Sequence, residues 1–114
     1  MQRRDYIIIK KILAEIDIAF DMLGDSDINA FLDDEKLKRA VGMTVINIGE
    51  LVKNISADTR IKYRSIPWKA ITGMRDIAAH KYQTLRMEDV YNTVVTDFPD
   101  LRDNLKMIIE NETE

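Results

Sequence analysis

The sequence has no cysteine, a single histidine, and only two proline and four glycine residues. Without cysteine the chain can form no disulfide and use no thiolate chemistry, and a reducing cytoplasm is the expected compartment. One histidine leaves any metal site to carboxylates, and no spacing typical of zinc or calcium ligands is present, so we expect neither metal nor cofactor. No apolar run approaches the length of a membrane span, and no secretory signal is evident.

The charge is distributed unevenly along the 114 residues, which are expected to form one domain over residues 1–114. The net charge is −3, but residues 60–86 carry seven basic side chains against one acidic side chain. Residues 87–114 carry two basic and eight acidic side chains. The central third could therefore contact phosphates, or it could pair with the acidic C-terminal third. Charge alone does not decide between these two readings.

Apolar spacing predicts helices throughout. One stripe at helical spacing runs from Tyr6 to Leu23, and a short segment follows around 28–32. Asp33 or Asp34 is expected to cap a helix that ends near Ile55. Because this helix is apolar on more than one face between 40 and 52, it is either central in a bundle or part of a dimer interface. Residues 56–66 are expected to be a polar, basic connection.

Pro67 suits the first turn of a further helix, expected to run to about His80 and to carry Trp68 inward. The last helix has six apolar residues in phase across Pro99, which predicts a kink there and not a break: Val90, Val94, Phe98, Leu101, Leu105 and Ile108. The predicted fold is all-α, an antiparallel bundle of four to five helices.

The candidate chemistry lies around the only histidine. Arg75 precedes His80 by five residues, and Tyr82 follows it by two. A histidine can exchange protons near neutral pH, and an arginine offers donors that suit a phosphate and its developing charge. Asp76 lies one helical turn before His80, where it can accept a hydrogen bond from the imidazole and support it. An inert ion pair on a helix surface would fit the same Asp76–His80 spacing.

Basic and aromatic residues near this histidine are candidates to contact RNA. Lys69 and Lys81 could bind phosphates, and the ring of Tyr63 could stack against an unpaired base. Trp68 is expected to be a core residue instead, because aromatic residues at helical spacing usually are.

The chain resembles the HepT-like family of HEPN domains over nearly its whole length. The resemblance is carried by four short stretches, most specifically within 66–82: Ile48-Gly49-Glu50, Ile66-Pro67-Trp68, Gly73-Met74-Arg75 and Ala79-His80-Lys81-Tyr82. The family motif is arginine, four residues, histidine, one residue and tyrosine, which here is matched by Arg75, His80 and Tyr82. Asp76 departs from the polar residue, often asparagine, that commonly follows the arginine, and it adds a negative charge beside the site.

This resemblance implies a HEPN bundle and a metal-independent ribonuclease toxin whose homodimer brings two motifs into one cleft. It also implies an antitoxin partner, a minimal nucleotidyltransferase that uses ATP to add AMP to Tyr82. Two alternatives stay open at this point. The chain could be a non-catalytic HEPN dimer that serves as a scaffold for the nucleotidyltransferase, or an unrelated helical bundle in which the motif occurs by chance.

Overall fold

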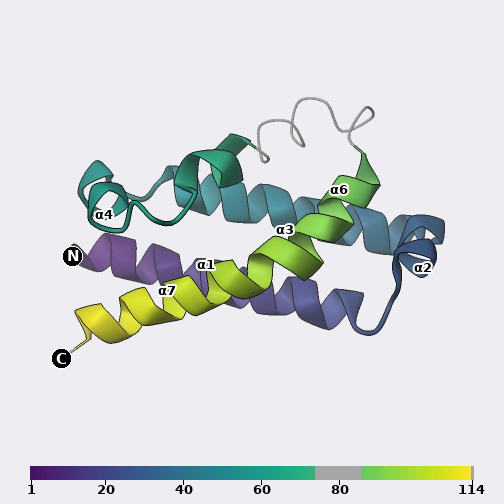
Figure 1. The fold of residues 1–114 in the computed structure, drawn as a ribbon, viewed down its shortest axis with the longest axis horizontal. Coiled ribbons are helices and arrows are strands. Elements are labelled where there is room, and N and C mark those ends of the chain that lie inside the picture. The colour runs from purple at the N-terminus through teal and green to yellow at the C-terminus, as the bar shows by residue number, and fades with distance from the viewer. Residues whose placement is uncertain (74–85, 114) are drawn as a thin grey trace.

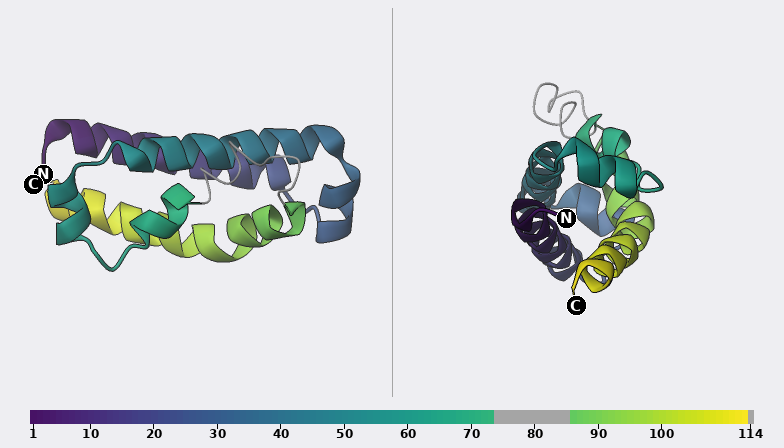
Figure 2. Two further views of the ribbon diagram at one scale, coloured as in Figure 1. Left: turned by 90° about the horizontal axis from the view of Figure 1, so that it is seen from above. Right: turned by 90° about the vertical axis from the view of Figure 1, so that its left-hand side faces the viewer.

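The computed structural model describes residues 1–73 and 86–113, and every regular element in these ranges is helical. Two long helices, α1 (Arg3–Leu23) and α3 (Glu35–Lys53), lie side by side. The C-terminal helices pack along them, and both chain ends lie near α4 (Figures 1 and 2). The prediction of an all-α helical bundle is confirmed.

Local capping explains where the first helices begin and end. Gly24 ends α1 with a φ of 51°, and its N–H donates to the carbonyl of Phe20 at 2.9 Å. A positive φ of this kind costs glycine little, because it has no Cβ. Asp27 caps the short helix α2 (Ile28–Asp33), and Asp34 caps α3 by accepting from the N–H of Leu37 at 3.0 Å. The short segment predicted around 28–32 is thus a helix, and of the two predicted caps, Asp33 and Asp34, it is Asp34 that caps α3.

The C-terminal part is one continuous helical path in three sections. The helix α6 (Met87–Asn92) passes into a π-helical turn, η2 (Thr93–Asp97), and then into α7 (Phe98–Glu112). Pro99 has no N–H to donate, and the wider π turn falls directly before it. The prediction that the chain stays helical across Pro99, without a break, is confirmed, and all six apolar residues predicted to be in phase are buried.

One expectation about the chain between α3 and Pro67 is wrong. Residues 56–66 were expected to be a polar connection, but they contain the helix α4 (Ala57–Lys62). The Ser56 side chain caps it, with an acidic residue in its first turn and basic residues in its last turn. These charges complement the helix dipole. The connection is therefore a folded segment with its own anchors.

The core is one cluster of buried apolar side chains contributed by α1, α2, α3 and the C-terminal helices, together with Ile55, Ile66 and Trp68. The helix α3 buries more than one face in it, including Gly42 and Gly49, and leaves Met43 57% exposed. Packing of this buried surface against α1, α2 and α6 thus accounts for much of the apolar character of α3. No helix in residues 1–73 and 86–113 is long and apolar enough to cross a membrane.

Candidate functional site

The predicted site residues divide into two groups by position. Arg75, Asp76, His80, Lys81 and Tyr82 lie outside the residues that the structure describes. Their roles stay predictions. The two remaining candidates, Tyr63 and Lys69, lie on the segment that leads to them and can be placed.

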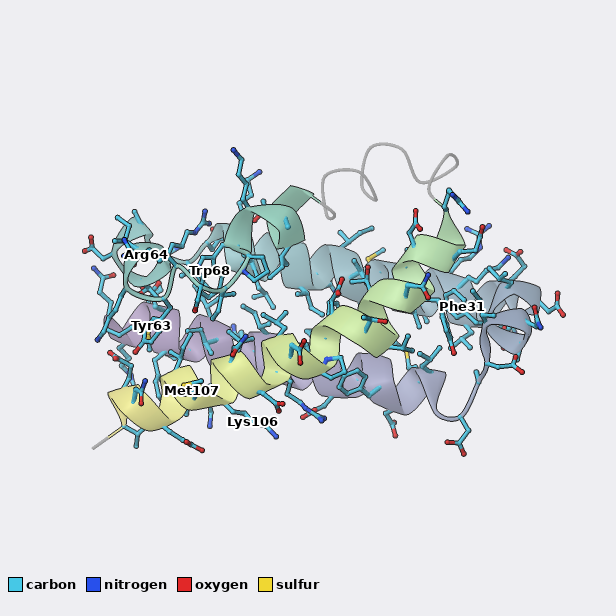
Figure 3. The ribbon with its side chains drawn as sticks, viewed as in Figure 1. Phe31, Tyr63, Arg64, Trp68, Lys106 and Met107 are labelled. Carbon is cyan, nitrogen blue, oxygen red and sulfur yellow. The ribbon has the colours of Figure 1, made fainter. Side chains whose placement is uncertain are left out.

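Trp68 begins the helical segment 68–73, whose chain continues toward Arg75. Its side chain is 6% exposed, and its Nε1–H donates to the carbonyl of Tyr63 at 3.1 Å. The prediction that Trp68 belongs to the core is confirmed. Because the indole reaches back to Tyr63, it fixes the start of the 68–73 segment against the turn after α4 (Figure 3).

The basic side chains of this region do not all remain available. Arg60 donates from its guanidinium to the carbonyls of Val52 and Lys53, at 2.9 Å each, and so caps the end of α3. Lys62 lies 2.8 Å from a carboxylate oxygen of Glu112. Arg64 and Lys69 are exposed, and neither has an ion pair or hydrogen bond within residues 1–73 and 86–113. No group among the described residues therefore occupies the Lys69 ammonium, which agrees with its predicted role in binding an anion.

The start of α4 is held by the Asp5 cluster, which consists of Asp5, Ser56 and Thr59. The Asp5 carboxylate is 1% exposed and accepts from the Ser56 hydroxyl at 2.5 Å, the Thr59 hydroxyl at 2.7 Å and the Ser56 N–H at 3.1 Å. Burial alone would raise the pKa of Asp5, but the hydrogen bonds from Ser56 and Thr59 outweigh it and lower the pKa. Sequence spacing gives no sign of this cluster, because Asp5 is more than 50 residues from Ser56 and Thr59.

The end of α4 is held by the Glu112 cluster, in which Glu112 meets Lys62, Tyr63 and the α-amino group of Met1. The Glu112 carboxylate lies 2.8 Å from Lys62 Nζ and 2.9 Å from the amino group, and it accepts from the Tyr63 hydroxyl at 2.7 Å. The hydrogen bonds from Lys62, Tyr63 and the amino group lower the pKa of Glu112 to about 2. The Tyr63 hydroxyl therefore has a structural partner, and Lys62 covers the ring at 5.5 Å from its centroid.

A cavity of about 310 Å³ lies between α3, residues 67–71 and the C-terminal helices. Its floor is apolar and includes Ile48, Ile71 and Leu101, while Asp97 and Asp100 contribute carboxylates. The helical segment 68–73 thus has an acidic neighbour on the side of Ala70 and Ile71. No group of three or more histidine, aspartate or glutamate residues that could hold a metal ion occurs among the described residues.

Comparison with known proteins identifies the class. The family described as "Ribonuclease HepT-like" matches residues 12–108, which is most of the chain. The chain therefore belongs to the HepT-like ribonuclease family. The matched range includes the stretch 66–82 on which the resemblance was based.

Individual relatives carry names of the same kind. "Putative RNase TTE0752" of Caldanaerobacter subterraneus subsp. tengcongensis is 31% identical over 91% of this chain and 93% of its own length. "Putative RNase MJ0125" of Methanocaldococcus jannaschii is 32% identical over 100% of this chain and 99% of its own. "Probable ribonuclease HepT" of Thermococcus cleftensis is 36% identical over 63% of this chain and 66% of its own. No solved structure matches the chain.

Proposed function

We propose that this chain is a metal-independent ribonuclease toxin that acts in the cytoplasm through Arg75 and His80. The observation that carries the proposal is that the family match over residues 12–108 encloses the arginine–histidine–tyrosine spacing at 75, 80 and 82. The names of the relatives support RNA as the substrate. Lys69 and Lys81 are proposed to bind phosphates of that RNA. Tyr63 is proposed to stack against a base with the ring face that Lys62 leaves uncovered.

The proposed reaction is an internal transfer within RNA. The 2′-hydroxyl attacks the neighbouring phosphorus and gives its proton to the imidazole of His80. The bond to the 5′-oxygen breaks, and that oxygen takes a proton from an acid, which leaves a 2′,3′-cyclic phosphate and a 5′-hydroxyl. Arg75 stabilises the charge on the phosphate oxygens as it builds, and Asp76 supports the imidazole.

We further propose that the active form is a homodimer. The reaction needs a base and an acid together, whereas each chain has one histidine. A twofold dimer would bring two copies of His80 to one cleft. Sedimentation should then find little monomer at micromolar concentration, and a monomer that still cleaves RNA would contradict the shared cleft.

The proposed regulation is the transfer of AMP to Tyr82 by a minimal nucleotidyltransferase antitoxin that uses ATP. The new phosphodiester would place a negative charge where Arg75 can bind it, and it would therefore compete with the phosphate of RNA. Tyr82→Phe should keep at least part of the activity and escape inhibition by the partner with ATP. If the partner and ATP still silence Tyr82→Phe, inhibition uses another contact.

The central experiment incubates purified protein with RNA in the presence of EDTA. Wild-type protein should cleave the RNA. The cleavage rate of His80→Ala and of Arg75→Ala should each fall by about 100-fold or more, as is typical when acid–base and charge-stabilising groups are removed. Lys36→Ala, at an exposed position on α3, serves as the matched control and should keep full activity. Cleavage only with added divalent metal, or full activity in His80→Ala, would overturn the mechanism. A protein that binds the nucleotidyltransferase but never cleaves would favour the scaffold alternative.

A further inference from the structure

We infer that Arg64 and Lys69 together form the phosphate-binding edge along which an RNA strand reaches the site, an inference that rests on the proposed function. The structure selects these two from the four basic residues between 60 and 69. The Arg60 guanidinium donates hydrogen bonds to two carbonyls of α3, and Lys62 forms an ion pair with Glu112. Of these four, Arg64 and Lys69 are the exposed residues that have no ion pair or hydrogen bond within residues 1–73 and 86–113.

Arg64 and Lys69 lie five residues apart, on the two sides of one hydrogen-bonded turn. Arg64 follows Tyr63 and Lys69 follows Trp68, and the Trp68 indole donates to the Tyr63 carbonyl at 3.1 Å. The turn between them is closed by further hydrogen bonds from Ile66 N–H to the Tyr63 carbonyl at 3.1 Å and from Trp68 N–H to the Ile66 carbonyl at 2.8 Å. Three hydrogen bonds thus hold the backbone between the two residues, which lowers the entropy lost when they bind.

Negative charge on the neighbouring surface favours one side of the 68–73 segment for binding a polyanion. The carboxylates of Asp97 and Asp100 line the cavity that Ala70 and Ile71 share with α7. A polyanion is repelled from that side of the 68–73 segment and attracted to Arg64 and Lys69.

The test measures binding without cleavage. The probe is a single-stranded 2′-O-methyl RNA oligonucleotide, whose blocked 2′-oxygens cannot attack, and its affinity is followed by fluorescence anisotropy between 50 and 200 mM salt, roughly the range in which phosphate contacts are lost. Arg64→Gln and Lys69→Gln should each weaken binding about 3- to 10-fold at low salt and reduce the salt slope by about 0.7. Arg64→Lys should keep the salt slope.

Lys106→Gln is the matched control. It removes the same charge from an exposed lysine of α7, at the edge of the bundle away from Arg64 (Figure 3). It should leave affinity and salt slope unchanged, and all variants should unfold at the wild-type temperature. Equal weakening by Lys106→Gln, or unchanged binding in both Arg64→Gln and Lys69→Gln, would overturn the inference. If Arg64→Gln and Lys69→Gln bind the probe like wild type while wild-type protein cleaves unmodified RNA, the inference about this edge is wrong and the proposed ribonuclease function stands. If the probe binds through Arg64 and Lys69 but wild-type protein does not cleave unmodified RNA, the edge stands and the proposed ribonuclease function is wrong.

Discussion

The two short helices at opposite ends of the bundle, α2 and α4, are anchored in different ways. Each has six residues, too few to be stable alone in water, so each depends on contacts with the rest of the chain. α2 is held by Phe31, whose side chain is fully buried and whose ring meets that of Tyr91 at a centroid distance of 5.5 Å. α4 is held by the carboxylates of Asp5 and Glu112 at its two ends.

The two kinds of anchor differ in how precisely they orient their helix and in how their contribution to stability depends on pH. Burial of an aromatic ring stabilises without a directional requirement and without regard to ionisation. Carboxylates that accept several hydrogen bonds fix the orientation of their donors, and these bonds are stronger while the carboxylate is charged. α4 precedes the turn that presents Arg64, Lys69 and the segment toward Arg75. The end of the bundle that carries Arg64 is therefore the end whose anchors are directional and depend on ionisation.

The largest expected effect tests the apolar anchor. Phe31→Ala removes a fully buried ring and should lower the free energy of unfolding by about 3–5 kcal/mol. Urea denaturation followed by circular dichroism measures the change, provided that the transition stays two-state. Leu32→Ala, a half-buried neighbour on the same helix, is the control and should cost clearly less. A loss below about 1 kcal/mol for Phe31→Ala would mean that α2 is held by other contacts.

A smaller effect is expected at the polar anchor. Asp5→Ala leaves two hydroxyl donors and the Ser56 N–H without their common acceptor, and should cost about 2–3 kcal/mol at pH 7. Asp21→Ala removes an exposed carboxylate from the same helix and should change stability by less than about 0.5 kcal/mol. Similar losses in the two variants would show that the Asp5 cluster does not hold α4.

Much of the fold could be predicted because it depends on local periodicity. The stripes of α1, α3 and the last helix follow from apolar spacing, and the Asp34 cap follows from residue type. The helix α4 was missed because it buries a threonine, Thr59, and shows no apolar stripe. Its signal lay in the ends: Ser56 as a cap, Asp58 in the first turn and basic residues in the last.

Sequence alone could predict those site residues that belong to a known motif or whose burial follows from residue type and helical spacing. The proposed roles of Arg75, His80 and Tyr82 rest on spacing, and the buried position of Trp68 followed from its residue type and is confirmed. Asp5 and Glu112 gave no such signal, since each meets partners about 50 residues away. For the same reason, composition could not tell which basic residues are already paired. Arg60 and Lys62 resemble Arg64 and Lys69 in sequence, and only the fold separates them.

The smallest effect at neutral pH is expected at Glu112, where the contribution of an ionised anchor to stability should depend on pH. The pKa of Glu112 is about 2 in the folded chain against an ordinary value of 4.5. Because the folded value is the lower one, the stabilisation is complete well above pH 4.5 and is lost as the pH falls toward 2. Glu112→Gln, which has no carboxylate to protonate, should therefore be less stable than wild type at pH 7, and the difference between their urea midpoints should shrink steadily at pH 4 and pH 3. Glu110→Gln, at an exposed neighbouring position, should follow the wild-type curve. A difference for Glu112→Gln that stays constant from pH 7 to pH 3 would show that its carboxylate is not the ionising anchor of α4.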